Sequence, residues 1–134
     1  NKLEYVSSKK FKNFNKKFDL VIIVDVLHHI GIDNAYKVLK SLSKISKNIL
    51  IKDHFEYGFF SRHLLRFVDF YANYAYDVTI PKKYFDYKSW HKTVIKSNLK
   101  QIKFLKNFQQ HDGLFNLILN KKHHFIALLK NEKF

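Results

Sequence analysis

Two short clusters of acidic and histidine residues are the places in this sequence where chemistry could occur. Asp25 is followed by His28 and His29 in the segment DVLHH, and Asp53 directly precedes His54. An imidazole titrates near neutral pH and can take a proton from a substrate. Carboxylates and imidazoles together can also bind a metal ion through oxygen and nitrogen ligands. Both clusters are therefore candidates for an acid–base site or a metal site.

The spacing of these residues argues against a metal site. Adjacent histidines usually point in different directions, and none of the histidines forms the pair, four residues apart, that places two ligands on one helix face. His123 and His124 open a predicted strand, where alternation sends them to opposite faces. We therefore predict no metal ion. We consider His28 and His54 as general bases, with packing inside the protein as the alternative role for each.

Both clusters follow segments of strand length. Residues 18–26 (FDLVIIVDV) and 47–55 (KNILIKDHF) are apolar on both faces, which is typical of buried, parallel strands. Residues 32–46 between them have a helical stripe of apolar residues, with Asp33 as the candidate N-cap. This order predicts a right-handed strand–helix–strand unit. In open α/β sheets, ligands bind beyond the carboxyl ends of the strands, where both clusters lie.

The second half of the chain predicts two helices and a strand pair. Residues 59–76 form a long aromatic helix, and we expect about half of its aromatic and aliphatic residues in the core and the rest around a pocket. Residues 86–99 form a shorter amphipathic helix, with Asp86 as a candidate cap. Residues 100–108 and 123–131 read as strands, most simply an antiparallel pair.

Composition limits the classes of function that fit. The length of 134 residues predicts one domain, residues 1–134. The net charge of +14 suggests nucleic acid, but of 25 basic residues only Arg62 and Arg66 are arginine, the residue favoured for phosphate and base recognition. We therefore predict a solvated lysine-rich surface. The chain has no cysteine, which excludes disulfides and fits a cytoplasmic location, and it has no apolar run long enough to span a membrane.

The order of these segments resembles the C-terminal part of the class I S-adenosylmethionine-dependent methyltransferases that act on small molecules. Residues 18–30 (FDLVIIVDVLHHI) are similar to the fourth strand of that family and its following loop, and residues 49–55 (ILIKDHF) to the fifth strand. Residues 66–94, from RFVDFYANYAY to SWHKTV, resemble the insert of one subgroup. The resemblance covers nearly the whole chain.

The resemblance implies an α/β fold class, a partial Rossmann-like methyltransferase sheet. It would contain strands 3 to 7 of the family order 3-2-1-4-5-7-6, with helices on both faces and a closing antiparallel strand pair. Residues 57–100 would be a helical insert or lid. The family's glycine-rich loop is missing, because the only glycines are Gly31, Gly58 and Gly113. We therefore expect an N-terminally truncated domain whose fourth-strand equivalent has an open edge.

The resemblance also implies roles for particular residues, with S-adenosylmethionine as the cofactor. The end of the third strand lies near the adenine in the family, and the loop after the fourth strand lies near the methionine end. The corresponding cofactor-binding residues here are Ser7, Ser8, Asp25, Val26 and Leu27. His28 and His54 are the predicted catalytic bases. The predicted substrate-binding residues are His29, Asp53, Arg62, Tyr71, Tyr84 and Trp90.

The predicted function is methyl transfer to an oxygen or carbon nucleophile of a small molecule, as part of a longer enzyme. Family members that methylate nucleobase or glutamine nitrogens carry an Asn/Asp-Pro-Pro-aromatic phrase after the fourth strand, and this chain has DVLH there. We expect the 134 residues alone to be inactive. Two other functions stay open: a non-catalytic Rossmann-like remnant that pairs with another chain, and a basic RNA-binding or RNA-modifying domain.

Overall fold

The computed structural model describes residues 16–76, 78–110, 112–113, 116 and 118–134. Ser7 and Ser8, the predicted adenine contacts, and the predicted strand around them lie outside the described residues.

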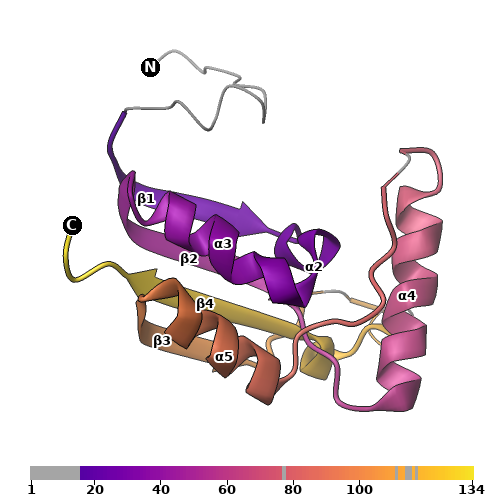
Figure 1. The fold of residues 1–134 in the computed structure, drawn as a ribbon. Coiled ribbons are helices and arrows are strands. Elements are labelled where there is room, and N and C mark those ends of the chain that lie inside the picture. The colour runs from indigo at the N-terminus through magenta and orange to yellow at the C-terminus, as the bar shows by residue number, and fades with distance from the viewer. Residues whose placement is uncertain (1–15, 77, 111, 114–115, 117) are drawn as a thin grey trace.

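The described strands form one mixed sheet (Figure 1). It contains β1 (Phe18–Val24), β2 (Ser46–His54), β3 (Lys100–Lys106) and β4 (His124–Lys130), in the order β1-β2-β4-β3. β1 and β2 are parallel, whereas β4 is antiparallel to both β2 and β3. This order matches strands 4-5-7-6 of the expected family sheet and confirms the closing antiparallel pair.

Local sequence explains where two of the helices begin. α2 (Leu27–Ile30) and α3 (Ile32–Leu42) meet at Gly31, whose φ of 88° lies in the region that favours glycine. Gly31 is therefore the N-cap of α3, and the prediction that Asp33 caps it is wrong. In α5 (Tyr87–Ser97), Asp86 is the N-cap as predicted, because its carboxylate accepts the Ser89 N–H at 2.7 Å.

One face of the sheet is covered. α3 and α5 lie side by side on it (Figure 1), over the fully buried side chains of β2 and β4. These side chains alternate along each strand, since successive residues point to opposite faces. They include Ile49, Ile51, Ala127 and Leu129, each 0% exposed.

The opposite face of β1 is not covered by any helix of the described part of the chain. Leu20, Ile22 and Val24 are 44%, 59% and 53% exposed. They pair in register with Asn48, Leu50 and Lys52 of β2, so the open face extends onto the next strand. The expectation of helices on both faces is not met by the described helices, because α3 and α5 pack on the same side.

The aromatic helix, α4 (Phe59–Asn73), stands at the carboxyl end of the parallel strands (Figure 1). Its buried residues are Ser61, Leu65 and Asp69. The expectation that half of its large residues are core is wrong, because the helix buries only a narrow stripe. Its outward face carries Phe59, Phe60, Phe67, Phe70, Tyr71 and Tyr74, all more than half exposed.

None of the described helices combines the length and the apolar character that crossing a bilayer requires.

A 3₁₀ turn, η1 (Lys121–His123), leads into β4.

Candidate active site

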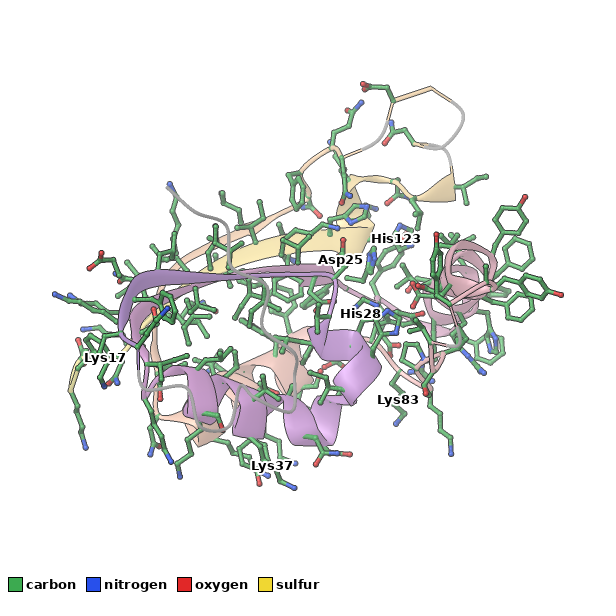
Figure 2. All side chains as sticks on the ribbon, turned by 90° about the horizontal axis from the view of Figure 1, so that it is seen from above. Lys17, Asp25, His28, Lys37, Lys83 and His123 are labelled. Atoms are coloured by element: carbon green, nitrogen blue, oxygen red, sulfur yellow. The ribbon has the colours of Figure 1, made fainter. Side chains whose placement is uncertain are left out.

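The turn after β1 brings the first histidine cluster onto the end of β2. Asp25 has a φ of 52°, and its carboxylate binds the Lys52 Nζ at 2.5 and 2.6 Å. The chain turns sharply there, and α2 begins two residues later. The N–H of Leu27 donates to Asp53 Oδ2 at 3.0 Å, which holds the start of α2 against β2. His28 therefore lies over the carboxyl end of the strand, between β1 and α4 (Figure 2).

His28 and Asp53 form a buried dyad. Nδ1 of His28 lies 2.5 Å from Oδ1 of Asp53, and the two side chains are 1% and 0% exposed. The Asp53 carboxylate also accepts the N–H of Leu27 at 3.0 Å and the N–H of His54 at 2.7 Å. With its oxygens held by two backbone donors, Asp53 cannot rotate freely. It thus fixes the orientation of the His28 ring.

The other side of the His28 ring faces α4. Nε2 lies 3.4 Å from Oδ2 of Asp69, and the same oxygen accepts a hydrogen bond of 2.5 Å from the Tyr84 hydroxyl. Asp69 was not among the predicted site residues. The sequence does contain a sign of this role, because Asp69 is a lone acid in the middle of the aromatic helix. An acidic side chain is rarely buried in a protein unless it is paired.

These contacts control the protonation of the cluster. Burial lowers the pKa of His28, but the hydrogen bonds and charges of Asp53 and Asp69 outweigh it and raise the pKa to about 9. Burial raises the pKa of Asp69, but its hydrogen bonds with His28 and Tyr84 bring it below its usual value. Burial and the Asp69 carboxylate together raise the pKa of Tyr84. At neutral pH the cluster is therefore an imidazolium between two carboxylates.

His54 behaves in the opposite way. Its ring centroid lies 5.1 Å from that of His28, and its Nε2 lies 3.5 Å from Asp25 Oδ1. Burial, the positive charge of His28 and that of Lys52 lower its pKa to about 4. His54 is consequently neutral at physiological pH and a weaker base than His28.

Comparison with known proteins identifies the fold. No protein-family model and no curated protein matches the sequence. Among solved structures, the mitomycin 7-O-methyltransferase MmcR matches with a TM-score of 0.55 and 16% identity, over 90% of this chain and 32% of that chain. Magnesium protoporphyrin IX methyltransferase ChlM from Synechocystis PCC 6803, with bound S-adenosylhomocysteine, matches with a TM-score of 0.55 and 11% identity, over 91% and 48%.

The chain has the class I methyltransferase fold. It spans only 32% and 48% of the lengths of these two structures. A third match, described as a pericyclic reaction enzyme, has a TM-score of 0.57 and 11% identity, over 87% of this chain and 27% of that chain. One fold thus accompanies more than one kind of reaction.

Of the predicted cofactor residues, the three that the structure describes lie in the turn after β1, at the carboxyl end of the parallel strands. Asp25 and Val26 are accessible there, with 32% of the Asp25 side chain and 47% of Val26 exposed. Leu27 differs, because its side chain is fully buried and its N–H is bonded to Asp53. Asp25 and Val26 are therefore accessible at this edge, whereas the Leu27 side chain belongs to the core.

The predicted substrate residues separate into two groups. Besides Asp53, the His28 cluster includes Tyr84 and His29, whose ring centroids lie 5.4 and 4.0 Å from that of His28. Tyr71 is 80% exposed on the outer face of α4.

Two other predicted substrate residues have structural partners. Arg62 binds Glu56 through two hydrogen bonds of 2.6 and 2.9 Å. Trp90 is 3% exposed, and its Nε1 donates to Gln101 Oε1 at 2.7 Å. It packs against Phe85, Phe104 and Phe125 in the core, away from the site.

The structure brings His28 and His29 together with Asp69, although adjacent histidines usually point in different directions. Ligand atoms of His28, His29 and Asp69 lie within 4.8 Å of one another. Nδ1 of His29, however, lies 3.1 Å from the Thr79 carbonyl oxygen. The absence of a metal stays a prediction.

Proposed function

We propose that this chain contributes the acceptor side of an S-adenosylmethionine-dependent methyltransferase site, acting on an oxygen or carbon nucleophile of a small molecule. The observation that carries the proposal is the 2.5 Å contact between His28 Nδ1 and Asp53 Oδ1 at the carboxyl end of β2. A carboxylate that holds one ring nitrogen leaves the other free to exchange a proton.

The cofactor supplies an electrophilic methyl group when it is bound. Asp25 and Val26, with Leu27, Ser7 and Ser8, are the residues that we propose to hold it. Once His28 has lost its Nε2 proton to solvent, Nε2 accepts the proton of the acceptor hydroxyl or acidic carbon as that atom attacks, and Asp53 stabilises the imidazolium that forms. The pKa of His54, about 4, makes it the weaker base, so we propose that His54 contacts the acceptor and does not deprotonate it.

Asp69 has to leave His28 Nε2 before an acceptor can reach it. Because Asp69 is one cause of the raised pKa of His28, an acceptor that displaces its carboxylate also lowers that pKa, so more of His28 is neutral and able to accept a proton at neutral pH. Tyr84, which holds Asp69, and His29 line this position, and we propose them with Asp53 as the acceptor-facing residues. Arg62, Tyr71 and Trp90 lie outside it.

The neighbouring structures support this reaction class. MmcR is named as an O-methyltransferase, and ChlM was solved with S-adenosylhomocysteine. The pericyclic reaction enzyme has the same fold, so the reaction has to be tested directly.

The test is transfer of an isotopically labelled methyl group from S-adenosylmethionine to a panel of phenols and acidic carbon compounds, using the longest natural form of the protein. His28→Ala should lower the rate by about 100-fold or more, since general base catalysis typically contributes that much. His63→Ala is the matched control, because His63 lies on the exposed face of α4. Equal rates for the two variants, or no labelled product with any acceptor, would refute the proposal.

A second candidate function is pairing with another chain through β1. β1 is an edge strand of the sheet that the structure describes, and Leu20, Ile22 and Val24 on it are exposed. An apolar edge strand readily pairs with a further strand. Light scattering measures whether the chain forms a stable complex, and calorimetry measures its affinity for S-adenosylhomocysteine. A stable complex, together with a cofactor affinity that Asp25→Ala does not change, would support pairing without catalysis.

A further inference from the structure

A pocket lies at the carboxyl ends of β2 and β3, where Phe55 and Lys106 line it. Its volume is about 490 Å³, within the range typical of small-molecule sites. It shares no lining residue with the cluster of His28, Asp53, Asp69 and Tyr84. We call it the lysine–tyrosine pocket, after the residues that determine its chemistry: Phe55, Tyr57, Tyr87, Lys88, Lys106 and Lys122.

The pocket combines aromatic rings with ammonium groups. Lys106 Nζ lies 3.9 Å from the ring centroid of Tyr87 and 5.8 Å from that of Phe55. Lys122 Nζ lies 6.0 Å from the ring centroid of Tyr57. Tyr57 and Tyr87 are 50% and 56% exposed, so both rings are open to a ligand.

The acids that line the pocket are already engaged. Glu56 binds Arg62 at 2.6 and 2.9 Å and accepts the Tyr84 N–H at 3.0 Å. Asp86 accepts the Ser89 N–H at 2.7 Å as the cap of α5. Within the part of the chain that the structure describes, no carboxylate forms an ion pair with any of the three lysines of the pocket. The pocket therefore has an excess of positive charge.

We propose that the lysine–tyrosine pocket binds a small molecule with a flat apolar body and an anionic group, a phosphate or a carboxylate. The body stacks on the exposed rings of Tyr57 and Tyr87. The anion replaces the cation–π contacts of Lys106 and Lys122 with charge-assisted hydrogen bonds, which are stronger. This site is independent of the methyl-transfer proposal, because it uses none of the residues of the His28 cluster.

Calorimetric titration of the 134-residue chain with phenyl phosphate tests the proposal. Two matched ligands serve as controls: phenol, which lacks the phosphate group, and inorganic phosphate, which lacks the aromatic ring. Phenyl phosphate should bind at least about tenfold more tightly than either, because only it makes both kinds of contact. Amide chemical shifts of Tyr87, Lys106 and Lys122 should change most on binding.

Lys106→Gln and Lys103→Gln form a matched pair of variants on β3. Lys106 pairs with Phe125 and Lys103 with Leu128, so their side chains point to opposite faces of the sheet. Lys106→Gln should weaken phenyl phosphate by about tenfold, the value of one charge-assisted hydrogen bond, and Lys103→Gln by less than about twofold. Should Lys106→Gln unfold, Lys122→Gln serves with the same thresholds.

Equal losses in the two variants would overturn the proposal, since they would show attraction by overall charge. Equal affinity for phenyl phosphate and inorganic phosphate, or no binding of phenyl phosphate, would overturn it as well.

Discussion

Asp69 of α4 and His28 of α2 lie 3.4 Å apart, from carboxylate Oδ2 to imidazole Nε2. The contact joins the aromatic helix to α2, the short helix after β1. It covers the ring nitrogen that the proposed reaction requires, while Asp53 holds the other nitrogen. The helix therefore controls both access to His28 and its protonation.

Replacing Asp69 with asparagine should lower the pKa of His28 from about 9, because one of the two carboxylates that raise it is removed. The pKa is measured from the ring chemical shifts of His28 by NMR. Asp33→Asn, in the exposed first turn of α3, is the control and should leave the His28 pKa unchanged. An unchanged pKa in Asp69→Asn would show that Asp53 alone sets it.

Asp53→Asn should destabilise the fold by about 3–5 kcal/mol, the typical cost of leaving a buried charge without its partner. The buried His28 imidazolium would lose its nearest carboxylate. Urea unfolding followed by circular dichroism measures the change. Asp19→Asn, at an exposed position of β1, should alter stability by no more than about 0.5 kcal/mol. An equally small change in the free energy of unfolding for Asp53→Asn would contradict a buried charge pair between His28 and Asp53.

Stability should be greatest near pH 6.5 as far as His28 and His54 determine it. The folded pKa of His28, about 9, exceeds its unfolded value of 6.5, so its contribution is complete below pH 6.5 and is lost as the pH rises to 9. That loss is roughly 3 kcal/mol at most. The folded pKa of His54, about 4, lies below 6.5, so stability also falls as the pH drops from 6.5 to 4.

Unfolding free energies between pH 5 and pH 9 check this shape. His28→Gln should flatten the alkaline side of the curve, and His54→Gln the acidic side. His63→Gln should change neither. A wild-type curve that rises steadily from pH 6.5 to pH 9 would rule out the imidazolium assignment.

Trp90 and Tyr71 were both predicted to bind substrate, and their burial separates them. Trp90→Ala should cost about 3–5 kcal/mol of stability, because it opens a cavity in the core. Tyr71→Ala should cost no more than about 0.5 kcal/mol, since its ring is 80% exposed. Thermal unfolding measures both. A larger loss for Tyr71 would mean that another surface covers α4.

Local patterns in the sequence predicted much of the fold. The apolar runs before Asp25 and Asp53 identified β1 and β2, and the acid at the start of α5 identified its N-cap. The order of the segments also predicted the strand order and the closing antiparallel pair. These features depend on neighbouring residues or on chain order, which can be read directly from the sequence.

The sequence by itself therefore determined the described strands, most of the helix positions and the placement of both histidine clusters at one edge of the sheet. Only the tertiary structure decided that Asp69 reaches His28, that Trp90 is core and that the described helices cover one face. Periodicity shows which side of a helix differs from the rest, but not what that side meets. On α4 the aromatic side faces outward, and the stripe that contains a lone acid faces inward. There Asp69 accepts a hydrogen bond from Tyr84 and lies in ion-pair contact with His28.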